Sequence, residues 1–87
     1  MKNYNVLVGK IDNNGNGDMD IVCGSNNYCS ALVLFRSQFD VEVRQYKGWK
    51  LRNNEVIKVQ LVEQDSDDDE YFEILVEANI NSKGEIE

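Results

Sequence analysis

The sequence predicts a small α+β domain in which one helix packs on a largely antiparallel sheet, in the order β-β-α-β-β-β. Three observations predict it: two early apolar segments flank a turn rich in Asn and Gly, an amphipathic segment follows, and alternating segments fill most of the remaining chain. No repeat or linker divides residues 1–87. We therefore expect one domain, ending in a frayed tail at residues 81–87.

The chain opens with a predicted hairpin. Apolar positions alternate over residues 3–11, which is the period of a strand with one buried face. Asn, Asp and Gly fill residues 12–18, and they favour a chain reversal because Asn and Gly tolerate positive φ. Residues 19–23 then form the returning strand, which ends at Gly24.

A helix is predicted over residues 28–39. The preceding Ser-Asn-Asn segment, residues 25–27, supplies candidate N-caps, because these side chains accept hydrogen bonds from the free N–H groups of a first turn. Apolar residues then recur at helical spacing, which lays Leu32 and Phe35 across a sheet. A buried strand over residues 31–35 is the alternative.

The rest of the chain predicts three more strands. Residues 40–46 alternate strictly, and residues 47–52 continue this strand or bend it at Gly48. Residues 55–62 and 71–80 are two further strands, separated by an acidic turn. The opening of this order, a hairpin that leads into a helix, resembles a β-grasp domain. The resemblance implies a helix across the sheet, and a simple meander after the helix is the alternative.

Charge and composition argue against several functions. The chain carries 9 Lys and Arg against 16 Asp and Glu, and its net charge of -7 repels nucleic-acid phosphates and anionic membranes. It has no His, the commonest general base and a common metal ligand, so we expect no enzyme activity. No apolar run reaches the about 20 residues of a membrane-spanning helix, and we expect a cytoplasmic protein.

One segment has the spacing of a calcium loop. Oxygen-bearing side chains occupy alternate positions from Asp12, with Gly17 at the sixth position of the loop. An apolar strand follows, and in this respect the segment resembles the calcium loops of integrin-type β-propeller repeats. The resemblance implies five ligands: Asp12, Asn14, Asn16, Asp18 and Asp20. The alternative is a polar hairpin turn without a metal ion, and no other cofactor is expected.

An acidic run lies between the last two predicted strands. Residues 59–82 contain eight carboxylates and no Lys or Arg, although solvated surfaces usually mix both signs. Five of the nine basic residues lie within residues 44–58, so either the molecule is dipolar or its basic segment pairs with Glu73 and Glu77. We predict that the acidic run imitates a row of phosphates and occupies a basic groove. A turn that only aids solubility is the alternative.

The predicted contact surface combines this run with two aromatic residues that are typical interface anchors. Its members are Glu63, Asp65, Asp67, Asp68, Asp69, Glu70 and Glu73, with Tyr46 and Trp49.

In size, acidity and lack of catalytic residues the chain resembles, in kind, the small inhibitors that phages and mobile elements direct at host defence nucleases, such as anti-CRISPR proteins and DNA mimics. The resemblance implies a protein partner with a basic surface, belonging to a nucleic-acid-binding nuclease complex in the host cytoplasm. Two alternatives stay open. One is a calcium-stabilised binding module that uses residues 12–20, and the other is a structural or interaction protein whose acidic turn only aids solubility.

Overall fold

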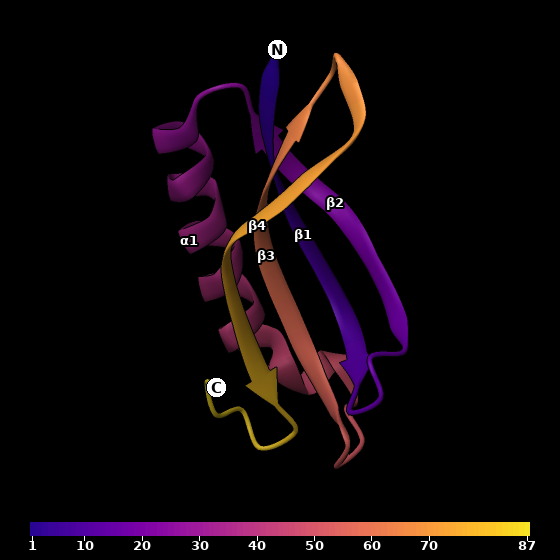
Figure 1. Cartoon of the computed structure of the whole chain (residues 1–87). Helices are drawn as coiled ribbons and strands as arrows, with labels where there is room; N and C mark the ends of the chain where they lie inside the picture. The colour runs from indigo at the N-terminus through magenta and orange to yellow at the C-terminus, as the bar shows by residue number, and fades with distance from the viewer.

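The computed structural model covers residues 1–87 and confirms the α+β class (Figure 1). Its elements in chain order are β1 (Lys2–Asp12), β2 (Gly17–Ser25), α1 (Tyr28–Gln45), the short 3-10 helix η1 (Tyr46–Trp49), β3 (Glu55–Asp65) and β4 (Asp68–Asn81). The structure therefore has four strands instead of the expected five. Its one long helix is not apolar enough to cross a membrane.

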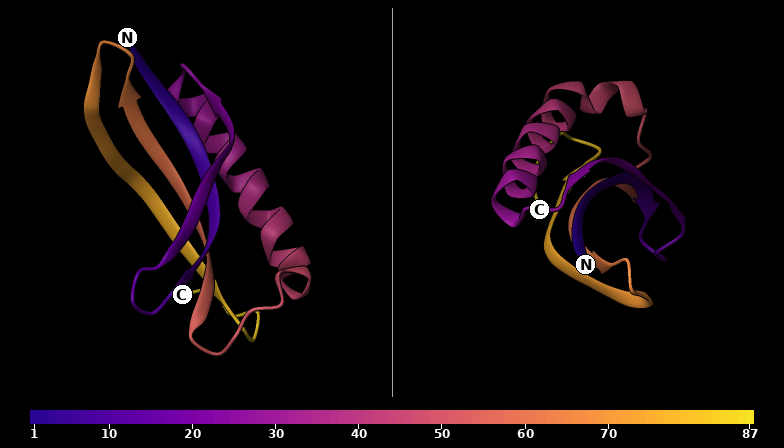
Figure 2. Two further views of the ribbon diagram at one scale, coloured as in Figure 1. Left: turned by 90° about the vertical axis from the view of Figure 1, so that its right-hand side faces the viewer. Right: turned by 90° about the horizontal axis from the view of Figure 1, so that it is seen from above.

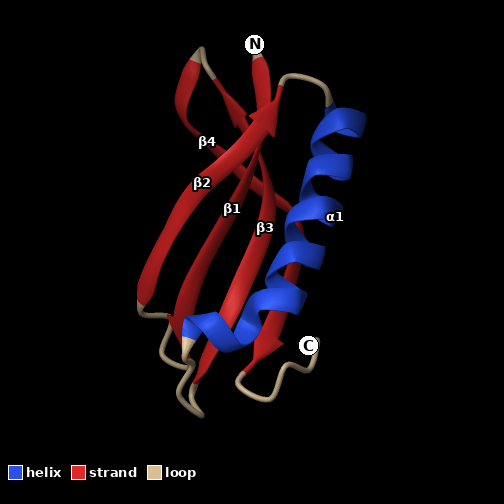
Figure 3. Ribbon diagram, turned by 180° about the vertical axis from the view of Figure 1, so that it is seen from behind, coloured by secondary structure: helices blue, strands red, loops and turns tan.

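The four strands form one twisted sheet in the order β2-β1-β3-β4, and every neighbouring pair is antiparallel. α1 lies along one face of this sheet, and the opposite face carries no second layer (Figures 2 and 3). The hairpin that leads into a helix is present as expected from the β-grasp resemblance. After the helix, β3 pairs antiparallel with β1, and β4 returns beside β3.

The expected strand over residues 40–46 is wrong, because residues 40–45 belong to the second half of α1 and Tyr46 begins η1. Its alternation coincides with a continued helical pattern, in which Val43 and Tyr46 follow Phe39 on the face that packs on the core. Arg44 also pairs with Asp40 one turn earlier, at 2.7 Å. The chain leaves the helical conformation at Lys50, which has a φ of 54°.

The core lies between α1 and the sheet. Its buried members come from β1, α1, β3 and β4, and they are Val6, Val8, Ala31, Phe35, Ile57, Val59, Leu61 and Ile80. Leu32 is half-buried and packs against this cluster, and Phe35 is 6% exposed. Both residues thus lie on the sheet-facing side of α1, as the helical spacing predicts.

Residues 81–87, expected to fray, fold back against the end of β4. Backbone hydrogen bonds join Asn79 to Glu87 and Asn81 to Glu85, and Ile80 forms an antiparallel bridge with Ile86. The reversal uses Gly84 at a φ of 82°, and the ring of Tyr46 packs so closely on Gly84 that a Cβ there would lie 2.6 Å from the ring. The tail is therefore tied both to the sheet and to η1.

Candidate functional site

The acidic run forms the end of the β3–β4 hairpin. β3 extends to Asp65 and β4 begins at Asp68, so the reversal consists of Ser66 and Asp67 alone, and the expected turn over residues 63–70 is much shorter. Aspartates make this tight reversal: Asp65 Oδ1 accepts from the Asp67 N–H at 2.9 Å, and Asp68 Oδ1 accepts from the Glu70 N–H at 3.0 Å. Most of the carboxylates are consequently held on strands.

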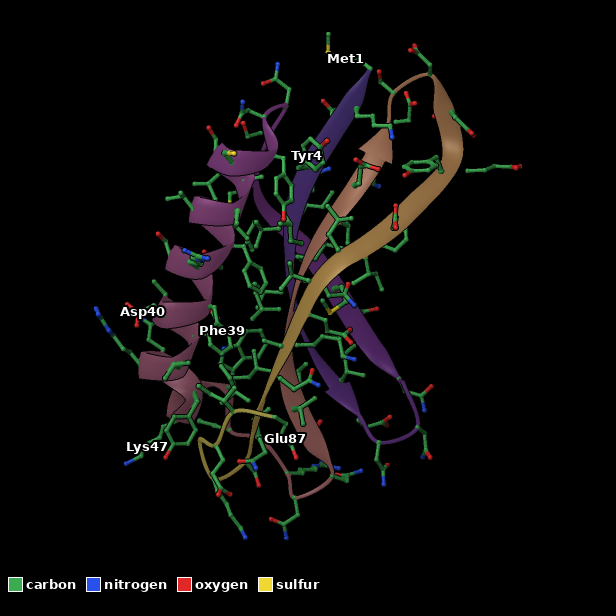
Figure 4. The ribbon with its side chains drawn as sticks, turned by 60° about the vertical axis from the view of Figure 1, so that its left-hand side comes forward. Met1, Tyr4, Phe39, Asp40, Lys47 and Glu87 are labelled. Carbon is green, nitrogen blue, oxygen red and sulfur yellow. The ribbon has the colours of Figure 1, made fainter.

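The hairpin end lies next to the start of β1 and extends beyond the first turn of α1 (Figures 1 and 4). The backbone carbonyl of Met1 accepts hydrogen bonds from Ser66, at 2.9 Å from its N–H and 3.1 Å from its hydroxyl. These contacts fix the direction in which the turn projects.

Glu63, Asp65 and Glu73 form the base of the acidic surface, and we call these three carboxylates the root. Glu63 and Glu73 face each other across β3 and β4, an arrangement of like charges that destabilises a sheet unless it is compensated. The Tyr71 hydroxyl lies between them, hydrogen-bonded to Glu63 and 3.0 Å from Glu73 Oε2. Lys2 Nζ adds a positive charge 3.3 Å from Glu63 Oε2. Neighbours from other strands therefore stabilise the root.

Hydrogen bonding sets the ionisation of this cluster. The Tyr71 hydroxyl holds the pKa of Glu63 below its usual range, with smaller contributions from Tyr4 and Lys2. In return, the bond to the Glu63 carboxylate raises the pKa of Tyr71, and the same carboxylate, opposite Tyr4 on the neighbouring strand, also raises the pKa of Tyr4. Glu63 is thus ionised at neutral pH, whereas both phenols keep their protons.

The Met1 ammonium lies 3.0 Å from Asp65 Oδ1 and 2.6 Å from Asp67 Oδ2. The Asp67 backbone N–H and then this ammonium lower the pKa of Asp65. The sequence around residue 65 contains no sign of these partners, because Met1 and Lys2 come close only through the register that pairs Lys2 with Asp65.

Four further carboxylates are exposed at the end of the hairpin, and we call them the crest: Asp67, Asp68, Asp69 and Glu70. The side chain of Asp67 is 84% exposed in spite of its contact with Met1. No cationic group lies within 4 Å of the other three carboxylates. The crest is therefore the part of the acidic run that is free to meet a partner.

Tyr46 and Trp49, expected in the same contact surface, lie on η1 at the other end of the molecule, where Figure 4 labels Lys47. Both are used internally. Tyr46 packs on Gly84, and the Trp49 indole N–H donates to Glu42 Oε2 at 2.6 Å. The structure thus brings the acidic members of the predicted surface together and separates the aromatic members from them.

Glu42 is a buried carboxylate that the sequence analysis missed. It is 6% exposed, and its second oxygen accepts from Gln38 Nε2 at 3.0 Å. Because Gln38 lies one turn earlier on α1 and Trp49 lies on η1, the carboxylate joins the two helices. The only signal in the sequence is that Glu42 lies three residues after Phe39 on the sheet-facing side of α1.

Glu42→Ala should lower the free energy of unfolding by about 1–3 kcal/mol, because it leaves the Trp49 and Gln38 donors without their acceptor. Trp49 is the only tryptophan, so its emission should also shift to longer wavelength as η1 loosens. Denaturant titration followed by fluorescence measures both effects. Glu42→Gln keeps the shape and one acceptor oxygen and should have a smaller effect, whereas an unchanged spectrum in Glu42→Ala would show that the indole does not depend on this bond.

The proposed calcium ligands are spread along a tight hairpin. Asp12 Oδ1 faces the loop backbone and accepts from the N–H groups of Asn14 and Asn16, both at 2.9 Å. Asp18 and Asp20 lie on β2, in register with Lys10 and Val8 of β1. No group of three or more His, Cys, Asp or Glu side chains is placed to hold a metal ion. The Asp12 side chain thus stabilises the turn itself, as it would in a polar hairpin turn.

Calorimetric titration should accordingly give no binding isotherm at micromolar calcium, because closing the loop around an ion would break the β1–β2 pairing next to the turn. Asp12→Ala serves as the control. A clear isotherm in the wild-type chain that disappears in Asp12→Ala would contradict this expectation and restore the calcium site.

The five basic residues within residues 44–58 divide into two groups. Lys58 Nζ pairs with Glu77 Oε1 at 3.1 Å on β3 and β4, and Gln60 and Lys58 together hold the pKa of Glu77 below its usual range. The other four, which we call the basic end, lie at the end of α1 and in the segment that follows: Arg44, Lys47, Lys50 and Arg52. The expected pairing across the sheet is therefore present for Lys58 with Glu77, and the other four basic residues gather at the end of α1.

No family model, curated protein or solved structure matches this chain. The function is therefore inferred from the geometry of its residues.

Proposed function

We propose that this chain is a non-enzymatic binding protein whose crest docks into a basic, nucleic-acid-binding surface of a partner protein, as an inhibitor from a phage or mobile element does. The observation that carries the proposal is the crest itself. Residues 67–70 are all exposed on a hairpin that extends beyond the helix, and Asp68, Asp69 and Glu70 have no cation within 4 Å.

The backbone of the hairpin supports docking by exposed charges. Asp65 pairs with Asp68 and Gln64 pairs with Phe72, so residues 69–71 form a bulge outside the regular ladder, and this bulge includes Asp69 and Glu70. The root and the contacts of Met1 with Ser66 restrain the hairpin before any partner binds. A preorganised row of charges loses less conformational freedom on binding than a flexible acidic loop does, which favours affinity.

The chemistry of the root supports a role in binding rather than catalysis. Tyr4 and Tyr71 lie beside Glu63, and raised pKa values keep both phenols protonated and therefore weakly nucleophilic at neutral pH. The lowered pKa of Glu63 makes it a weak base. These residues are better suited to holding the hairpin than to transferring protons.

Neutralising the crest should leave the fold intact and slow partner binding. The variant carries Asp67→Asn, Asp68→Asn, Asp69→Asn and Glu70→Gln, which keep the side-chain acceptors of the turn. Complementary charge mainly raises the association rate, so the variant should bind more slowly and with a weaker dependence on salt. The partner is first captured from a lysate of the native host and identified by mass spectrometry, and association rates are then measured at two ionic strengths.

A matched control neutralises four exposed carboxylates far from the crest, as Asp18→Asn, Asp20→Asn, Glu85→Gln and Glu87→Gln. It has the same net charge as the crest variant and should bind almost like the wild type. A DNA duplex should compete with the wild-type chain for the captured protein. Equal association rates for the crest variant and the wild type would mean that the crest only aids solubility. A captured partner that does not bind nucleic acid would contradict the proposed docking into a nucleic-acid-binding surface.

A further inference from the structure

The crest and the basic end lie at opposite ends of the molecule. The crest lies beside Met1 and the start of β1, and the basic end lies where α1 passes into η1, as the Met1 and Lys47 labels show in Figure 4. Carboxylates lie at this second end too, because Asp40 pairs with Arg44 and the tail with Glu85 and Glu87 folds back toward η1. Lys47, Lys50 and Arg52 are exposed, and none of them makes an ion pair within the chain. The molecule is 39 Å long, so the crest and the basic end are too far apart to neutralise each other internally.

The basic end also contains an open hollow. It is lined by Arg44, Gln45, Lys47, Gly48 and Trp49. Gly48 leaves space above the backbone, since a Cβ there would meet no atom within 4 Å. Arg44 is partly neutralised by Asp40, whereas Lys47 on the rim keeps its full charge. The hollow is therefore positively charged and accessible.

We propose that this hollow receives the crest of a second copy, so that copies of this chain associate head to tail. The turn of the β3–β4 hairpin is only two residues wide and presents carboxylates, and the hollow presents one uncompensated cation, Lys47, beside the paired Arg44 and an open floor. Every copy thus carries two surfaces of complementary charge. The restrained hairpin prevents the crest from folding back onto its own basic end, so the contact forms between molecules.

This association goes beyond the proposed function and does not depend on it. The contact joins two different surfaces, so it is heterologous and leads to open chains that lengthen with concentration unless a ring closes. Exposed ion pairs stabilise only weakly, and we expect a dissociation constant on the order of 1 mM. A copy whose crest is occupied in this way would not bind a basic partner.

Self-association should be strongest at an intermediate salt concentration. The Debye length is about 30 Å at 0.01 M salt, so the net charge of -7 makes whole molecules repel each other. At about 0.1 M salt the length falls to about 10 Å, so the facing groups of crest and hollow decide the interaction. At about 1 M salt the length is about 3 Å, and these contacts are screened too.

Small-angle scattering and sedimentation across a range of protein concentrations and the three salt conditions test the proposal. Two charge-reversal variants probe the two ends: the hollow variant, with Lys47→Glu on the rim of the hollow and Lys50→Glu beside it in the basic end, and the crest variant, with Asp69→Lys and Glu70→Lys. Each should weaken association by about tenfold or more. Arg36→Glu, in the middle of α1, reverses one charge outside the basic end, as Lys47→Glu alone does in the hollow, and should weaken association much less than that single variant. Circular dichroism checks that each variant folds.

A mixture of the two reversed variants should associate again, because the positive crest of one meets the negative hollow of the other. Trp49 lines the hollow, so the emission of the wild-type chain should change with protein concentration, whereas the crest variant, altered far from Trp49, should show no such change. The proposal is overturned if the mass stays monomeric in all conditions, if Arg36→Glu has the same effect as Lys47→Glu alone, or if Trp49 responds to inorganic phosphate or a DNA duplex but not to a second copy.

Discussion

Phe35→Ala should lower the free energy of unfolding by about 3–5 kcal/mol. Phe35 lies in the middle of α1, is 6% exposed, and stacks on Phe39 with ring centroids 6.3 Å apart. Removing the ring loses the burial free energy and leaves a cavity between the helix and the sheet. For a small domain this loss is a large fraction of the about 5–15 kcal/mol that usually separates folded and unfolded states.

Chemical denaturation measures this loss, and Val33→Ala is the matched control. Val33 lies on the same helix but is 62% exposed, so its truncation should change stability by less than about 0.5 kcal/mol. Leu32→Ala should fall between the two, at about 2 kcal/mol, because Leu32 is half-buried against the core. Equal effects of Phe35→Ala and Val33→Ala would mean that the helix packs with another face on the sheet.

Gly9→Ala should also be strongly destabilising, by about 2–3 kcal/mol. Gly9 is buried in β1, and a Cβ at this position would lie 2.1 Å from the backbone carbonyl oxygen of Asp18 and 2.7 Å from the Met19 sulfur. The methionine side chain can move, but the carbonyl belongs to the paired strand β2. Alanine therefore forces β1 and β2 apart and weakens their ladder of hydrogen bonds.

Gly48→Ala provides the contrast in a thermal denaturation experiment. A Cβ at residue 48 would meet no atom within 4 Å, and the backbone there has a negative φ. Alanine should therefore be neutral or stabilise by about 0.4–1 kcal/mol, because it restricts the unfolded chain. If both substitutions changed the melting temperature by the same amount, the close approach of β1 and β2 at Gly9 would not be a determinant of stability.

The start of α1 could be predicted from the sequence, and its end could not. Asn27 is the N-cap, and its Oδ1 accepts from the Ser30 N–H at 2.9 Å, which is a local interaction of the kind that sequence patterns reveal. The second half of α1 looks like an alternating strand only if Glu42 is taken to face solvent. Glu42 is instead buried, because the side chains of Trp49 and Gln38 donate hydrogen bonds to its carboxylate. These contacts form only in the folded chain, so the sequence pattern does not indicate them.

The sequence predicts which acidic residues make up the candidate site, but it does not predict which residues compensate their charge. A run of carboxylates without cations is visible in the sequence, and the structure places it at one end of the molecule. The compensating groups are Met1, which precedes β1, and Lys2 and Tyr4 on β1, about sixty residues earlier, and they reach the root through the β1–β3 register. Tyr46 and Trp49 are predicted to lie in an interface because aromatic residues are common there. In the structure Tyr46 packs on Gly84 and Trp49 bonds to Glu42, so both side chains make contacts within the fold.

The folding back of residues 81–87 has a consequence for unwanted strand pairing. An exposed sheet edge is a template for aggregation, because its N–H and C=O groups can join another strand. The backbone of Glu85–Glu87 occupies such groups only at Asn79–Asn81, the last residues of the edge strand β4. On the other edge strand, β2, Asp18 and Asp20 carry negative charge, and the irregular pairing opposite Val6 and Leu7 interrupts the straight ladder. The end of one edge is thus covered by its own chain, whereas the other edge is protected by charge and distortion.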